Sequence, residues 1–117
     1  LMTLREEMAG IAVPGKLYGI MAAGRPALMV GPEASESGET IRGYDAGYVV
    51  DPSREADPEH ALYDRMLRLY SDDEERTRLG ENGREAFLEN FERDVCCREW
   101  EVLLKEQVQT DRQPVAA

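Results

Sequence analysis

Two short apolar runs limit what this chain can fold into. Residues 27–30 (ALMV) and 47–50 (GYVV) are each followed directly by a pair that ends in proline, Gly31-Pro32 and Asp51-Pro52. A continuous apolar run of this length is typical of a strand that is covered on both faces, as in a parallel sheet. The apolar segment 1–4 is a third candidate strand.

Helical patterns alternate with these runs and then continue along the chain. Strands that alternate with helices indicate a parallel sheet, joined by right-handed crossovers, with helices on its faces. Because only two or three strands are visible, we expect an α/β fold that corresponds to the C-terminal half of a doubly wound domain. The expected helices cover residues 14–24, 35–42, 57–70, 72–91 and 94–109.

Particular residues mark the ends and the weak points of these helices. Pro14 fits the first turn of the first helix, and Gly24 ends it. Ser35 and Asp57 are the expected N-caps of the second and third helices. Gly80 and Gly83 lie in the middle of the fourth helix, where each is expected to weaken it by about 1 kcal/mol relative to alanine.

Composition excludes several classes of partner. The 117 residues include 24 acidic and 14 basic side chains, and the formal net charge of −10 repels nucleic acid. No apolar run approaches the ~20 residues that span a bilayer, so we expect no transmembrane segment. Cys96 and Cys97 are expected to be free thiols, which favours a cytoplasmic location.

We expect one domain, residues 1–109, and a disordered polar tail, residues 110–117.

The stretch 13–26, VPGKLYGIMAAGRP, places glycine and lysine at the start of a helix. Unpaired N–H groups and a partial positive charge at such an end attract anions. Gly15 would let a phosphate approach the backbone closely, and Lys16 would add a mobile cation. The alternative is that Gly15 eases a turn and Lys16 is a solvated side chain, and these residues alone leave both interpretations open.

The order of motifs along the chain resembles one family. VPGKLYGIMAAGRPALMVGP is followed by Ser35-Glu36, by DAGYVVDP, and by LYSDDEERTRLGENGREAFLENF. Over residues 1–105 this succession closely resembles the C-terminal donor-binding domain of retaining glycosyltransferases with the GT-B fold. The resemblance is to the group 1 family, and within it to the branch that assembles bacterial surface polysaccharides. It implies a Rossmann-like domain that binds a nucleotide-diphosphate sugar and needs neither a metal ion nor another cofactor.

The resemblance also assigns a site for the donor diphosphate. Gly15, Lys16 and Leu17 would present backbone N–H groups to it, together with the Lys16 ammonium. Gly15 replaces the serine that is usual in this motif, which removes one hydroxyl donor.

Four further residues are expected contacts to the donor: Glu7, Tyr18, Gly19 and Glu36. Gly19 stands where many relatives have the glutamate that holds the ribose hydroxyls. The partner acidic residue of the wider family, eight positions earlier, would fall on Ile11, and Glu7 or Glu6 in the preceding loop could substitute for it. The resemblance leaves the catalytic residues unknown.

Some of these side chains also have a simpler structural interpretation. Glu36 opens a helix, where a carboxylate complements the helix dipole. Tyr18, Met21 and Tyr70 are expected at the core or its rim. His60 has no neighbouring histidine or carboxylate at metal-ligand spacing and is interpreted as a surface or packing residue.

Our preferred interpretation is that the chain is a fragment of a hexosyltransferase. We expect this fragment to lack the acceptor-binding N-terminal domain and the first half of the donor domain. We expect the isolated chain to be inactive, and the parent enzyme to be cytoplasmic or peripheral at the inner membrane face. One alternative is a non-catalytic α/β module that binds a partner, or oligomerises through an exposed sheet edge. Another is a GT-B-fold sugar-nucleotide epimerase, which would need acid and base residues that the sequence does not offer.

Overall fold

The computed structural model describes residues 1–111, and the side chains of residues 1–109. The elements, in chain order, are β1 (Met2–Thr3), η1 (Glu6–Met8), α1 (Lys16–Ala22), β2 (Ala27–Val30), α2 (Glu36–Gly43), β3 (Gly47–Val50), α3 (Pro58–Ser71), α4 (Asp73–Ala86), η2 (Phe87–Phe91) and α5 (Arg93–Asp111). The first two residues of the predicted tail, 110–111, therefore belong to a helix. The rest of that tail lies outside the described residues.

Three parallel strands form one sheet in the order β1-β2-β3. β2 and β3 pair in register from Ala27 with Gly47 to Val30 with Val50. The predicted α/β fold, a short parallel sheet with flanking helices, is confirmed. Its correspondence to half of a Rossmann-like domain stays a prediction.

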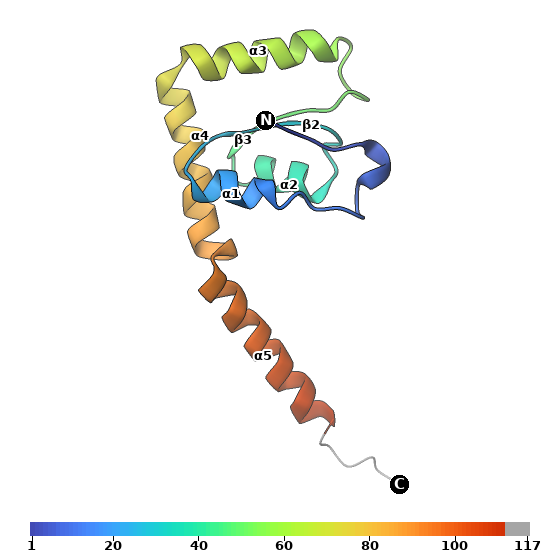
Figure 1. Ribbon diagram of the computed structural model, residues 1–117, viewed down its shortest axis with the longest axis vertical. Coiled ribbons are helices and arrows are strands. Elements are labelled where there is room, and N and C mark those ends of the chain that lie inside the picture. The colour runs from blue at the N-terminus through green and yellow to red at the C-terminus, as the bar shows by residue number, and fades with distance from the viewer. Residues whose placement is uncertain (112–117) are drawn as a thin grey trace.

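Helices lie on both faces of the sheet. α1 and α2 cover one face, and α3 crosses the other (Figure 1). The main buried core joins α1, α2 and α4 to the sheet through Met2, Leu17, Met21, Ala27, Met29, Ile41 and Ala86. Because full burial of one large apolar side chain contributes about 1.5–3 kcal/mol, this cluster fixes α1 against the strands.

The first helix is shorter than the sequence predicts. α1 begins at Lys16 with Gly15 as its N-cap, so the prediction that Pro14 occupies the first helical turn is wrong. The Pro14 carbonyl instead accepts a hydrogen bond from Leu17 N–H at 3.1 Å, which closes a tight turn before the helix. The predicted end is confirmed, since Gly24 has the positive φ of +66° that suits glycine.

Gly80 and Gly83 have a role that the sequence does not reveal. Both are buried in α4, where it crosses the end of α1. A Cβ on Gly80 would collide with the Gly24 carbonyl oxygen, and one on Gly83 would lie 3.3 Å from the Ala46 Cβ. These glycines cost helix propensity, as expected, but they permit the close approach of α4 to α1.

Side-chain caps begin the next three helices, and the predicted caps of the first two are confirmed. Ser35 Oγ accepts from Gly38 N–H at 3.2 Å, and Asp57 and Asp72 cap α3 and α4 in the same way. The predicted helix does reach Phe91, but its last five residues form the π-helical turn η2 and are not α-helical.

The two edges of the sheet are covered differently. α4 runs past the β3 side, where Tyr48 Oη donates to Glu75 at 2.7 Å and Asn82 donates to the Asp45 carbonyl at 3.0 Å. β1 has no neighbouring strand on its outer side within the described part of the chain. The exposed sheet edge that the sequence predicts is therefore the β1 edge.

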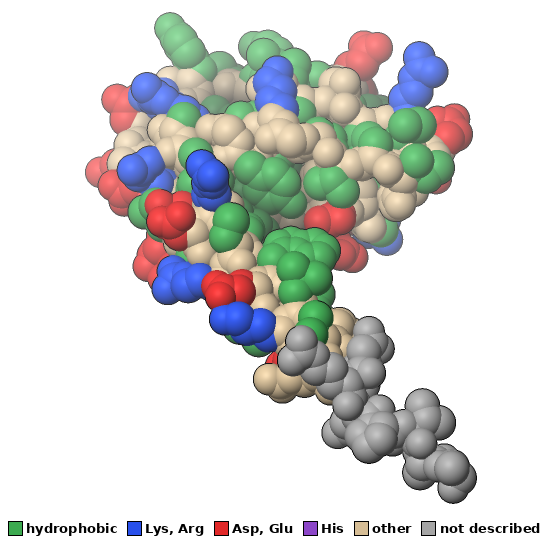
Figure 2. All heavy atoms as spheres, turned by 60° about the horizontal axis from the view of Figure 1, so that its bottom comes forward, with side chains coloured by type: hydrophobic (Ala, Val, Ile, Leu, Met, Phe, Trp, Pro, Cys, Tyr) green, Lys and Arg blue, Asp and Glu red, His purple; other side chains and the backbone are tan. Residues whose placement is uncertain are grey.

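The last helix, α5, projects from this body (Figures 1 and 2). Its main contacts are with η2, and the structure measures 66 × 30 × 17 Å. None of the helices in residues 1–111 combines the length and the apolar character needed to cross a membrane.

Candidate functional site

A cavity lies beyond the carboxyl ends of the three strands. Its volume is about 460 Å³, and it is open to solvent. The residues that line it belong to the strand ends, to the residues that follow them and to η1: Thr3, Leu4, Arg5, Glu6, Glu7, Val30, Gly31, Pro32, Asp51, Pro52 and Ser53. In open parallel sheets, ligands bind beyond the carboxyl ends of the strands, so this is where the fold would place one.

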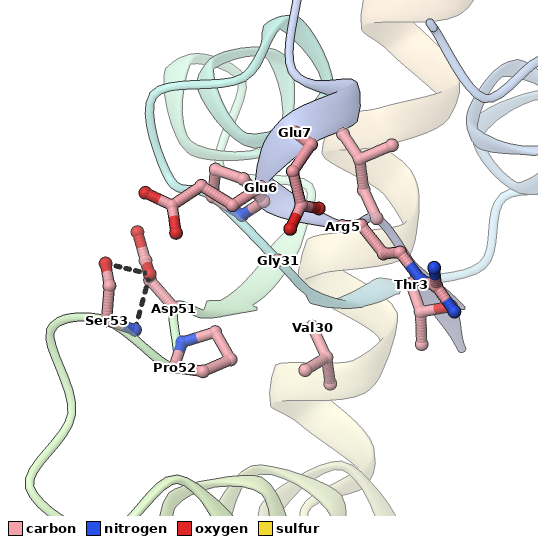
Figure 3. Close-up of a pocket in the computed structure, with 11 residues that line it drawn as sticks. Thr3, Arg5, Glu6, Glu7, Val30, Gly31, Asp51, Pro52 and Ser53 are labelled. Atoms are coloured by element: carbon pink, nitrogen blue, oxygen red, sulfur yellow. Dashed lines mark hydrogen bonds between the residues drawn. The ribbon is translucent and has the colours of Figure 1, made fainter.

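The turn η1 brings two carboxylates to this cavity. Met8 N–H donates to the Arg5 carbonyl at 3.0 Å, and Ala9 N–H donates to the Glu6 carbonyl at 3.1 Å. This tight turn directs the Glu6 and Glu7 side chains toward the space beside Asp51, whereas Arg5 extends toward Thr3 (Figure 3). Three carboxylates and one guanidinium therefore line the cavity.

Asp51 holds the ends of two strands together. Its carboxylate accepts hydrogen bonds from Glu33 N–H at 2.9 Å, and from Ser53 N–H at 2.9 Å and Ser53 Oγ at 2.7 Å. The hydrogen bond from Glu33 N–H is the largest cause that lowers the pKa of the Asp51 carboxyl below its usual value. The Asp51 carboxylate is therefore ionised, and these hydrogen bonds hold it in a fixed position in the wall of the cavity.

Asp51 is not among the site residues that the sequence predicts. A signal was present, because Asp51 directly follows an apolar strand and precedes proline. Polar residues at the carboxyl ends of parallel strands meet at one edge of the sheet.

The predicted diphosphate site lies at the start of α1 and is separate from the residues that line the cavity. This helix end has neither a side-chain cap nor an acidic residue in its first turn. Gly15 and Lys16 are exposed, and a Cβ on Gly15 would meet nothing within 4 Å. Leu17 departs from its predicted role, because its N–H already donates to Pro14 and its side chain is fully buried.

Two other predicted contacts, Tyr18 and Glu36, lie near each other. The pKa of Tyr18 is raised first by burial and then by the nearby charges of Glu36 and Cys96. The Tyr18 ring also packs against Phe91, with 4.9 Å between the ring centroids. Neither Tyr18 nor Glu36 lines the cavity, so the structure does not bring them together with Glu7.

The structure also shows where the other residues discussed in the sequence analysis lie. Gly19 is exposed in α1, where an added Cβ would have nothing within 4 Å of it, and Met21 is fully buried in the core. Tyr70 is 83% exposed, so the prediction that it lies at the core or its rim is wrong. His60 is exposed as predicted, but its Nε2 lies 3.3 Å from the Asp64 carboxylate one turn along α3, so the expectation that no carboxylate stands near it is wrong.

Comparisons with protein-family models, with curated proteins and with solved structures found no match to this chain. Among residues 1–111, no group of three or more histidine, cysteine or acidic side chains is arranged to hold a metal ion. The case for a function therefore depends on the cavity, on the start of α1 and on the sequence motifs.

Proposed function

We propose that this chain is the donor-binding part of a retaining glycosyltransferase with the GT-B fold. The parent enzyme would transfer a sugar from a nucleotide-diphosphate sugar to a glycan or a lipid-linked acceptor. The observation that carries the proposal is the cavity at the carboxyl edge of the parallel sheet, with Glu7 directed toward it. The motif VPGKLYGIMAAGRP supports the identity of the ligand.

The cavity and the start of α1 differ in charge, so they suit different groups of the ligand. Two unit charges 4 Å apart interact by about 4 kcal/mol at an effective dielectric constant of 20, so the carboxylates of the cavity repel a diphosphate. The start of α1 carries no acidic residue and offers Lys16 instead. We therefore assign the diphosphate to Gly15 and Lys16, where the helix dipole also favours it.

Hydroxyl groups of the donor suit the cavity. An ionised carboxylate only accepts hydrogen bonds, so the Glu7 and Glu6 side chains can hold the ribose hydroxyls. In the parent enzyme, the helix dipole and Lys16 would stabilise the leaving diphosphate without a metal ion or cofactor. The proposal includes a cytoplasmic location, in keeping with the free thiols of Cys96 and Cys97.

Exposed apolar side chains favour a second candidate, a non-catalytic module that binds a partner. On α3 the residues Tyr63, Met66, Leu67 and Tyr70 are between 47% and 83% exposed and follow helical spacing along one face. The open β1 edge offers a second contact, through which the chain could oligomerise.

Titration of the chain with UDP-, GDP- and ADP-sugars separates the two candidates. We expect at least one of them to raise the unfolding temperature, with weak affinity and without turnover, and we expect Lys16→Ala to abolish this shift. Lys105→Ala is the matched control, because Lys105 is exposed on α5 and pairs only locally, with Glu101. The donor-site proposal fails if no nucleotide sugar causes a shift, or if both variants behave alike.

A further inference from the structure

The helix α5 presents an apolar face that nothing in the described structure covers. It has 19 residues, and its main contacts are with η2 at its base. Five large apolar side chains of α5 are exposed. Four of them lie near one another around the helix, Trp100 (63%), Leu103 (47%), Leu104 (57%) and Val108 (52%), and the fifth is Val102 (57%). Because helices in proteins are stabilised mainly by the packing of an apolar face, this uncovered face is a candidate for a partner.

Most of the exposed apolar side chains of α5 lie on one side of the helix, and Val102 lies on the other side. Trp100, Leu104 and Val108 recur every four residues and therefore lie on one side of the helix, and Leu103 flanks them. Arg98, Glu99 and Glu106 lie toward the opposite side. Figure 2 shows apolar side chains gathered along one side of α5 and charged side chains along the other.

This face complements itself when two copies of the helix run antiparallel. With Leu104 at the two-fold axis, residues whose numbers are equally far from 104 face each other, so Trp100 meets the partner subunit's Val108. In the same arrangement Glu101 faces the partner subunit's Gln107. The same rule sets Leu103 beside the partner subunit's Lys105, whose aliphatic stem can cover it. The pairing therefore joins Trp100 to Val108 and Leu104 to its own copy, and it brings no two like charges face to face.

The area of contact is sufficient for a weak dimer. Burial of the four exposed apolar side chains and their flanks in both copies removes on the order of 1,000 Å² from water, which is near the lower limit for a specific interface. The net charge of −10 on each copy opposes association and is screened by salt.

We propose that the chain forms an antiparallel dimer through α5, with Leu104 at the two-fold axis. This goes beyond the proposed donor site, because it uses a surface that is separate from the cavity and from the start of α1. Because the interface is small, we expect a weak dimer whose Kd decreases as salt is raised.

The test is sedimentation velocity over about 1 to 200 μM protein, in reducing buffer so that Cys97 cannot crosslink two copies. We expect the mass to rise from the monomer value of 13.2 kDa to twice that value. Trp100 is the only tryptophan in the chain, so its emission should shift to the blue over the same concentration range.

Two variants locate the interface. Leu104→Glu places two carboxylates at the axis and should leave the chain monomeric at all concentrations. Val102→Glu is the matched control, because Val102 is also 57% exposed but lies on the other side of the helix, and it should still dimerise. Circular dichroism checks that both variants keep the folded body.

Three outcomes would overturn the proposal. The wild-type chain could stay monomeric up to about 200 μM, which would leave α5 to a different partner. Leu104→Glu could dimerise as well as the wild type, which would place the interface elsewhere, for example at the β1 edge. Both variants could also lose dimerisation equally, which would show that the effect of charge is not specific to one side.

Discussion

Substitution of Gly80 by alanine tests how α4 holds α1 in place. Gly80 is buried where α4 crosses the turn after α1, and an added Cβ would collide with the Gly24 carbonyl oxygen and lie 3.0 Å from the Gly24 carbonyl carbon. These atoms belong to the backbone, so they cannot rotate away as the end of a side chain can. The two segments must therefore move apart.

The expected cost follows from two opposing effects. Overpacking of a close contact costs about 1–3 kcal/mol, and the backbone clash places Gly80→Ala in the upper part of that range. Alanine recovers about 1 kcal/mol of helix propensity. The net loss in the free energy of unfolding is about 1–2 kcal/mol, which corresponds to a decrease of about 5–10 °C in Tm for a domain of this size.

Thermal unfolding followed by circular dichroism measures this effect. Gly19→Ala is the control, because Gly19 is also helical but has nothing within 4 Å of the added Cβ, and the change should raise stability by about 1 kcal/mol. The reasoning is refuted if Gly80→Ala is as stable as the wild type, or if the two substitutions shift Tm in the same direction.

Three further substitutions test individual hydrogen bonds. The pKa of Asp51 is lowered in the folded chain, so its stabilising effect is present at neutral pH and is lost as the pH falls from about 4 through the folded pKa. Asp51→Asn should therefore lower the urea midpoint at pH 7, and the difference from the wild type should shrink below about pH 4; a difference that does not change with pH would contradict this. Tyr48→Phe removes the hydrogen bond to Glu75 and should lower the free energy of unfolding by about 1 kcal/mol in urea titrations, whereas an unchanged midpoint would show that the bond contributes nothing. Ser35→Ala removes the cap of α2 and should cost a similar amount, about 1 kcal/mol, and unchanged thermal unfolding would argue against the cap.

The strands could be predicted from the sequence because local signals end them. β2 and β3 coincide with the apolar runs 27–30 and 47–50, and the pairs Gly31-Pro32 and Asp51-Pro52 follow directly. The caps Ser35 and Asp57 were equally clear, because a side-chain oxygen can satisfy the free N–H groups at a helix start.

Features that depend on distant parts of the chain could not be predicted. In the sequence, Gly80 only weakens a helix. Its packing role depends on Gly24, which lies directly against it in the structure. The turn η2 interrupts a helical pattern, and Phe91 within it packs against Tyr18 and Tyr44, which come from other elements.

The expected contacts with the donor stay predictions, but the structure locates the residues. Glu7 lines the cavity. Leu17 was expected to offer a free N–H, but the turn at Pro14 uses that group. This difference could not be foreseen because it depends on where α1 begins, and helix ends are the least certain part of a sequence-based prediction.

The most direct test of the donor site is a titration of the isotope-labelled chain with UDP-, GDP- and ADP-sugars, followed by the backbone amide signals in NMR spectra. We predict that at least one donor shifts two groups of signals together, those of Gly15 and Lys16 at the start of α1 and those of Glu7 and Gly31 at the cavity. Signals from α5 should stay in place. The account is contradicted if no donor shifts these signals, or if the shifts fall outside both groups.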